Sequence, residues 1–213
     1  MSAARPEHRR QALPREAGFT MIEALVTFVV LAIGVLGIVT LMTTSKTAQH
    51  EAAQRARAVT MADGILERIR ENPQAVNSYL RALDNPLGGG TITPAPPDPF
   101  TTPPADPNDV PAAVATYDLW AWEQQLDGAG VTVGGASTPS AGLREARGCI
   151  TFNPFHGRAN TGDLTVLLQW QGLHETSDGV PAGGAACGGS APDSDLFRRQ
   201  ISVSSFVTLS RED

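Results

Sequence analysis

Residues 18–42, GFTMIEALVTFVVLAIGVLGIVTLM, contain one long apolar segment with a single carboxylate, Glu23, near its start. The nineteen residues from Ala24 to Met42 include no charge and no proline. At about 1.5 Å per residue, a helix of this length reaches about 28 Å, close to the roughly 30 Å hydrocarbon core of a bilayer. The segment therefore predicts a membrane-spanning helix. A carboxylate at the edge of such a helix costs free energy, so Glu23 is expected to have a function and a partner.

The residues before the span, MSAARPEHRRQALPREAG, are short, polar and basic, with four arginines against two glutamates. Positive charge before a first span is typical of a cytoplasmic N-terminus, so the rest of the chain is expected to be exported. A cleaved secretory signal is an alternative, but it would have a shorter apolar run and a small-residue cleavage site after it. A twin-arginine signal is a second alternative, which only the pair Arg9 and Arg10 supports.

Helical character continues past the span through SKTAQHEAAQRARAVTMADGILERIRE at 45–71. Glu51 and Arg55 are spaced to form an i,i+4 ion pair. Asn72 and Pro73 predict the helix end, because a residue before proline avoids helical geometry. We expect one helix over 20–72, half in the membrane and half packed on a globular head. Apolar residues at near-helical spacing predict its packed face: Ala48, Ala52, Ala56, Val59, Ile65, Leu66 and Ile69.

The middle of the chain predicts a loop and a second helix. Residues 74–83 are expected to form a short helix or turn, and 84–111, rich in Pro, Gly and Asp, a surface loop. The stretch AAVATYDLWAWEQQL at 112–126 predicts a helix with Leu119, Trp122 and Leu126 toward the head. Trp120 is expected at the surface, as an interface anchor or a simple rim residue.

Strand patterns come late, at 148–152, 164–171 and 198–209. Residues 143–147 are candidates to extend the first strand, and Val131 and Val133 mark a weak additional one. In the last segment Ile201, Val203 and Val207 predict a half-buried strand with a slip near Ser204 and Ser205. Three or four strands after one long helix predict an α+β head with an antiparallel sheet.

The only cysteines are Cys149 and Cys187. In an exported chain, a lone pair most simply forms a disulfide, here between a strand and a Gly-rich loop. A metal site would need more ligands, and neither cysteine has a C-x-x-C partner or a histidine at finger spacing. The sequence therefore predicts a disulfide, no metal and no cofactor.

Charge and motifs argue for a structural or binding role. The formal net charge is −6, and without residues 1–18 it becomes −8, which argues against direct nucleic-acid binding. The chain has no H-E-x-x-H, G-x-S-x-G or P-loop motif, and His156 and His174 are its only histidines beyond the long helix. An enzyme is therefore not predicted, although an anchored periplasmic hydrolase is an alternative. So is an anchored binding protein that uses Trp120 or the acidic loop.

The stretch GFTMIE resembles the start of a type IV prepilin, in which the common pattern is G-F-T-L-[IV]-E and Met21 stands where leucine is usual. The resemblance implies that prepilin peptidase removes the cytoplasmic leader 1–18 by cleavage after Gly18, and that Phe19 is then N-methylated. It also implies a pilin fold, with a transmembrane and filament-core helix at 19–44 and a head at 45–213. In a filament, Glu23 would pair with the Phe19 amine of a neighbouring subunit. The alternative is that Glu23 only caps the first turn of the helix.

Five further segments resemble a minor pilin of the PilV kind, a type IV pilus modification protein: MADGILERIRENP, YDLWAWEQQL, CITF, LTVLLQWQG and FRRQISVSSFVTL. This resemblance implies a single-pass inner-membrane precursor with a periplasmic head, which then joins a pilus at the cell surface. Its expected role is to prime pilus assembly or to lie at the pilus tip. Its expected partners are prepilin peptidase, other minor and major pilins, and a tip adhesin. A type II secretion pseudopilin is the alternative within the same class.

Overall fold

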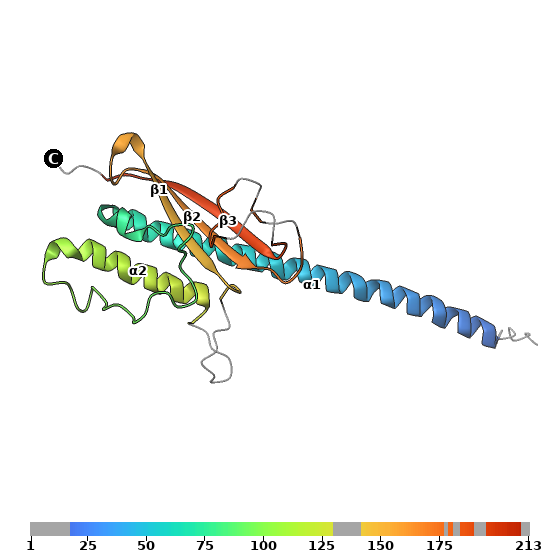
Figure 1. Ribbon diagram of the computed structural model, residues 1–213. Coiled ribbons are helices and arrows are strands. Elements are labelled where there is room, and N and C mark those ends of the chain that lie inside the picture. The colour runs from blue at the N-terminus through green and yellow to red at the C-terminus, as the bar shows by residue number, and fades with distance from the viewer. Residues whose placement is uncertain (1–17, 130–141, 177–178, 181–183, 190–194, 210–213) are drawn as a thin grey trace, which may run out of the picture. The chain divides into compact units, whose positions relative to one another are not determined.

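The computed structural model describes residues 18–129, 142–176, 179–180, 184–189 and 195–209 (Figure 1). The chain divides into two units, 1–48 and 49–213. The elements run in this order: α1 (Met21–Glu71), η1 (Pro73–Tyr79), η2 (Pro107–Asp109), α2 (Val110–Asp127), β1 (Arg147–Pro154), η3 (Phe155–Gly157), β2 (Gly162–Gln171) and β3 (Arg198–Val207). This is the predicted α+β layout of one long N-terminal helix and a small antiparallel sheet.

Helix α1 is continuous for 51 residues, as predicted. It ends before Asn72, whose backbone leaves the helical region at φ −126° and ψ 57° because Pro73 follows it. The predicted short helix after it is η1. Helix α2 begins two residues earlier than predicted and ends at Asp127. Gly128 follows it in the left-handed conformation, at φ 72°, that glycine favours.

The predicted packed face of α1 is correct only at its end. Ile65, Leu66 and Ile69 are buried, but Ala48, Ala52, Ala56 and Val59 are exposed. The stripe that packs on the head continues back from Ile65 in helical steps through Ala62, Ala58 and Gln54. Alanines occur on several sides of this helix, so they do not define its packed face.

The sheet has the order β1-β2-β3, with both pairs antiparallel. The register of β2 on β3 is unbroken from Gly162 opposite Val207 to Gln171 opposite Arg198. The predicted slip near Ser204 and Ser205 is therefore wrong. Burial alternates to the strand end at Val207, two residues before the predicted Leu209. Ser205 lies on the inner face because the register pairs it with the buried Leu164, and Arg70 of α1 donates a hydrogen bond to its hydroxyl there.

The possible extension of the first strand back to Leu143 is wrong except at Arg147. Residues 144 and 145 form a turn in which Glu145 has φ 50°, a conformation that ends strand pairing. The weak strand at Val131 and Val133 lies outside the described residues.

The core of the head lies between the inner face of the sheet and the two helices α1 and α2 (Figure 1). Trp122 of α2 is 1% exposed, and its Nε1–H donates to the Met61 carbonyl of α1 at 3.0 Å. A Cβ at Gly148 of β1 would lie 2.3 Å from the Trp122 ring, so only glycine allows α2 this close to the strand. Leu119 and Leu126 are buried, as predicted, and Trp120 is partly exposed beside Tyr117, with ring centroids 5.5 Å apart.

Candidate functional site

The segment predicted to be processed lies at the start of α1. Gly18, Phe19 and Thr20 precede the helix, and Phe19 is 81% exposed. The Thr20 carbonyl accepts the first helical hydrogen bond, from Ala24 N–H at 3.2 Å, and its hydroxyl accepts from Glu23 N–H at 3.3 Å. Thr20 therefore caps the helix, with Glu23 at the third helical position, as in a capping box. The Glu23 side chain is exposed in the first turn, where the helix dipole favours negative charge.

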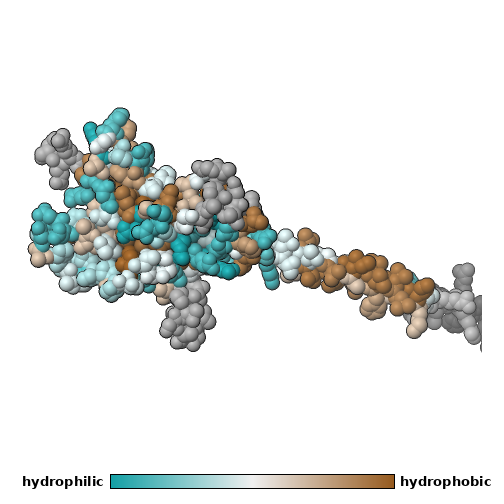
Figure 2. Space-filling view, in the orientation of Figure 1, coloured by the Kyte–Doolittle hydropathy of each residue, from teal (hydrophilic) through white to brown (hydrophobic). Residues whose placement is uncertain are grey.

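The apolar part of α1 follows directly (Figure 2). Among the described residues, α1 is the one helix that is long enough and apolar enough to cross a membrane, judged by length and composition. Its large apolar side chains are more than half exposed from Met21 to Met42. Side chains of this kind need lipid or other apolar helices around them, because so much exposed apolar surface is unfavourable in water. We therefore expect lipid or apolar helices of other molecules to surround this part of α1.

The predicted disulfide joins Cys149 and Cys187, with an S–S distance of 2.05 Å. Cys149 lies on β1, and Cys187 lies in the Gly-rich segment between β2 and β3, as the sequence indicates. Both cysteines are fully buried in a small cluster with Leu167, on the outer face of the sheet. Next to the disulfide, the Gly188 N–H donates a hydrogen bond to the Leu83 carbonyl at 2.9 Å. This hydrogen bond connects the Gly-rich segment to the loop after η1.

Loop 84–111 is anchored by a carboxylate that the sequence pattern did not single out. Glu123 of α2 is fully buried. Its Oε1 accepts hydrogen bonds from Gly88 N–H at 3.0 Å and from Thr91 N–H at 2.6 Å, and its Oε2 accepts from Ile92 N–H at 2.8 Å. Burial alone would raise the pKa of Glu123, but the hydrogen bonds from Thr91, Ile92 and Gly88 outweigh it, so the pKa is lowered. Glu123 is therefore held as a carboxylate that fixes the Gly-rich turn.

A second buried network joins α1, η1 and α2. The Tyr79 hydroxyl donates to Asp118 Oδ2 at 2.7 Å, and Arg68 Nη1 donates to Asp118 Oδ1 at 2.9 Å. Asn72 donates to the Tyr79 hydroxyl at 3.2 Å and to the Pro111 carbonyl at 2.8 Å. Burial and the hydrogen bond to Asp118 raise the pKa of Tyr79, so the phenol stays protonated and acts as a donor. The network fixes the turn at the end of α1.

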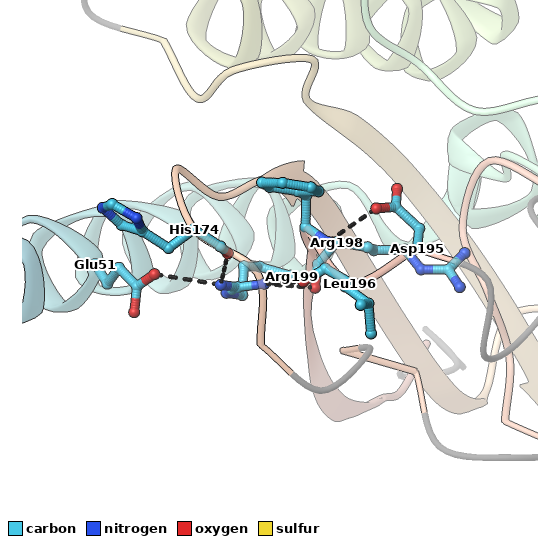
Figure 3. A network of polar contacts seen from close by, with 7 residues as sticks. Glu51, His174, Asp195, Leu196, Arg198 and Arg199 are labelled. Carbon is cyan, nitrogen blue, oxygen red and sulfur yellow. Dashed lines mark hydrogen bonds and ion pairs between the residues drawn. The ribbon is translucent and has the colours of Figure 1, made fainter.

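Arg199 joins α1 to the segments that flank β3 (Figure 3). Its Nη2 donates to Glu51 Oε1 at 3.2 Å and to the His174 carbonyl at 2.8 Å. Its Nη1 donates to the carbonyls of Leu196 at 3.2 Å and Arg198 at 3.1 Å. The predicted pair of Glu51 with Arg55 is therefore wrong, because Arg199 is the cation that reaches Glu51. A planar guanidinium has several N–H donors in a fixed geometry, so Nη1 and Nη2 can donate to these different acceptors at the same time.

We expect Arg199→Lys to lower the free energy of unfolding of the head by about 2 kcal/mol, because an ammonium on a single stem cannot reach all these acceptors. Glu51→Gln should cost less, about 0.5 kcal/mol, because the Glu51 side chain is 32% exposed. Denaturant unfolding of the full chain in detergent measures both. Arg158→Lys, at an exposed position on the β1–β2 hairpin, is the matched control and should change nothing. Equal stability of Arg199→Lys and the control would show that the Arg199 bonds contribute little.

The structure separates the residues singled out from the sequence into two groups. Gly18, Phe19 and Glu23 lie together at the start of α1, and Cys149 and Cys187 are bonded in the head. Glu123 and Arg199, which organise the head, were missed. A signal existed for Glu123, because this carboxylate lies beside Trp122 on the apolar side of a helix, where an unpaired charge is unfavourable. No local signal marks Arg199.

Over the described ranges, no group of three or more His, Cys, Asp and Glu side chains could hold a metal ion. His156 is exposed on η3, where its ring lies 4.1 Å from that of Phe155. His174 contributes its backbone carbonyl to Arg199.

A long helix that is apolar over its first half, packed by its second half on a small antiparallel sheet, defines a pilin-like protein. Comparison with protein-family models bears this out. Residues 40–120 match the family described as Type IV pilin Tt1218, and residues 13–39 match the prokaryotic N-terminal methylation motif. The two matched segments adjoin one another, so residues 13–120 are similar to a type IV pilin that begins with an N-terminal methylation motif. Comparison with curated proteins and with solved structures finds no significant match.

Proposed function

We propose that this chain is a minor type IV pilin that primes pilus assembly or lies at the pilus tip. In this proposal prepilin peptidase cleaves the precursor after Gly18, and the new N-terminal residue Phe19 is N-methylated. The precursor spans the inner membrane once, with residues 1–18 in the cytoplasm and the head in the periplasm. The mature chain then joins other minor and major pilins, with a tip adhesin as a further partner.

The observation that carries the proposal is the order of features at the N-terminus. A basic leader precedes Gly18 and Phe19, a capped first turn contains Glu23, and an exposed apolar helix continues without a break into the head. A plain membrane anchor needs the apolar helix but not the glycine, the phenylalanine or the carboxylate. The narrower assignment to minor pilins of the PilV kind is supported by the likeness of the segments around 61–73, 117–126, 149–152, 164–172 and 197–209.

The proposal gives Glu23 a specific role in assembly. Cleavage creates a charged amine on Phe19, and the amine of one subunit can meet the Glu23 carboxylate of its neighbour inside the filament. An unpaired charge in such apolar surroundings costs several kcal/mol, whereas a hydrogen-bonded pair offsets most of that cost. The pair would thereby set the register between subunits.

We expect Glu23→Ala to be processed normally but to reach sheared pili at a level about tenfold or more below wild type, because the Phe19 amine is left unpaired. Quantitative immunoblots of the membrane and sheared-pilus fractions measure this ratio. The substitution keeps the helix cap, since the bond to Thr20 comes from the Glu23 backbone N–H. Glu71→Ala, an exposed carboxylate at the other end of α1, is the matched control and should incorporate normally.

Normal incorporation of Glu23→Ala would leave only the capping role for this carboxylate. Absence of the wild-type chain from sheared pili would contradict the pilus subunit itself. If the chain then supported protein secretion, the pseudopilin alternative would hold instead.

A further inference from the structure

The helix cap at Thr20 separates the predicted cleavage point from the helix. Thr20 directly precedes α1, and its carbonyl accepts the first helical hydrogen bond, from Ala24 N–H at 3.2 Å. Its hydroxyl accepts a further hydrogen bond, from Glu23 N–H at 3.3 Å. Among the described residues, no backbone hydrogen bond involves Gly18 or Phe19. The peptide bond between these two residues therefore lies outside the helix, with its N–H and C=O groups open.

The residues before Thr20 do not by themselves explain why the helix begins at Met21. Residues 15–17, Arg-Glu-Ala, are good helix formers. Gly18 is unfavourable in a helix, but a single glycine does not stop one, since Gly34 lies within α1. Threonine is preferred at an N-cap because its hydroxyl accepts a hydrogen bond from an N–H of the first turn, which has no acceptor within the helix. The Thr20 hydroxyl therefore favours a helix that begins after residue 20 over one that begins earlier.

The conformation of the peptide bond after Gly18 matters for its hydrolysis. Cleavage adds water to the carbonyl carbon of Gly18 and breaks the bond to the Phe19 nitrogen. Both protons of the water end on that nitrogen, so Gly18 becomes a carboxylate and Phe19 an ammonium group. A peptidase must bring donors to the Gly18 carbonyl oxygen, where negative charge develops. In a helix that began earlier, this oxygen would instead accept from Ile22 N–H, four residues further along the chain.

We infer that Thr20 is a positioning residue for leader removal, because its hydroxyl starts α1 at Met21 and keeps the peptide bond after Gly18 accessible to prepilin peptidase. The inference rests on the proposed function, which supplies the cleavage. Thr20 acts through the backbone conformation of residues 18–20 rather than on the reacting atoms. Only precursor molecules in which this bond is open can bind productively, so the apparent affinity of the peptidase falls in proportion to their fraction.

Thr20→Val tests the inference, because valine has the shape of threonine but no hydroxyl. Thr27→Val is the matched control, since it removes a hydroxyl of the same helix that donates to the Ala24 carbonyl at 2.8 Å and caps nothing. The assay is cleavage of the whole precursor chain in detergent by prepilin peptidase. We expect kcat/KM to fall about fivefold in Thr20→Val, mainly through KM, and to stay at the wild-type value in Thr27→Val. Cleavage of Thr20→Val at the wild-type rate would overturn the inference.

Two rescue variants separate the cap from a direct contact between the hydroxyl and the peptidase. Serine keeps a hydroxyl at the cap, whereas asparagine caps as well as serine through an amide oxygen. Thr20→Ser and Thr20→Asn should therefore both be cleaved with a kcat/KM close to wild type. Rescue by serine without rescue by asparagine would overturn the inference, because the hydroxyl would then act on the peptidase itself.

Hydrogen exchange of the Glu23 amide measures the cap without the peptidase. In the whole chain in detergent, this amide should exchange about fivefold faster in Thr20→Val than in wild type, because it loses its hydrogen bond to the Thr20 hydroxyl. Unchanged exchange, or faster exchange with unchanged cleavage, would overturn the inference alone. Failure of the peptidase to cleave the wild-type chain after Gly18 would instead refute the proposed function.

Discussion

Replacing Gly18 with leucine is expected to abolish maturation, so that the chain stays in the membrane with residues 1–18 still attached. The physical reason lies outside the fold of the chain. Within the part of the chain that the structure describes, a Cβ built at Gly18 meets no atom within 4 Å, so a side chain there does not disturb the described helix or head. It would instead collide with a peptidase that must bring the peptide bond between residues 18 and 19 to its catalytic groups. The size of the membrane-bound chain on immunoblots measures the effect.

Gly34→Leu is the matched control for this experiment. A Cβ built at Gly34 also meets no atom within 4 Å, and Gly34 lies in the apolar part of α1, far along the chain from the cleavage point. The Gly34 variant should be processed like wild type, whatever its effect on assembly. Normal maturation of the Gly18 variant would show that the peptide bond after this glycine is not the one cleaved.

The second large effect is expected at Glu123. Glu123→Gln should lower the free energy of unfolding of the head by about 2 kcal/mol at neutral pH, because charge-assisted hydrogen bonds become neutral ones. The amide would also turn a donor toward one of the backbone N–H groups whose hydrogen bonds the carboxylate now accepts. The loss should loosen the Gly-rich turn from Gly88 to Ile92, which protease cleavage in that turn would report.

The stability that Glu123 contributes should also depend on pH. The pKa of Glu123 in the folded head lies below its ordinary value of 4.5, so the unfolded chain takes up a proton first as the pH falls. The stabilisation is therefore complete above pH 4.5 and is lost as the pH falls through the folded pKa. The stability difference between wild type and Glu123→Gln should shrink in that acidic range. Denaturant unfolding of the full chain in detergent from pH 7 to about pH 3 measures it.

Glu67→Gln is the control for the Glu123 experiments. Glu67 pairs with Arg70 at 2.7 Å, but its side chain is 63% exposed, so its removal should change stability little at any pH. A Glu123 variant as stable as this control would show that the buried carboxylate does not hold the loop.

The elements that the sequence predicts well are those with long, local patterns. The apolar run from Ala24 to Met42 predicts the first half of α1, and the proline after Asn72 predicts where this helix ends. The alternation in the three late segments predicts the three strands. None of these patterns depends on the rest of the chain. The lone cysteine pair was predictable because no other partner exists for either residue. At the start of α1, the glycine, phenylalanine and glutamate are recognisable because they occur in a fixed order.

The features that the sequence does not predict depend on distant partners. Glu51 has Arg55 at helical spacing, yet its partner Arg199 is 148 positions away. The packed face of α1 is set by where the sheet and α2 lie, and alanines fit on either side of the boundary. Likewise, the serines at 204 and 205 look like a break in the alternation, until Arg70 provides a polar partner on the inner face.

The central proposal is that this chain is a pilus subunit released from its leader after Gly18. Mass spectrometry of the N-terminal peptide of the chain from sheared pili tests it most directly. The predicted result is a mature protein that begins with N-methyl-Phe19. A chain in pili that keeps residues 1–18, or one that begins elsewhere, would contradict it.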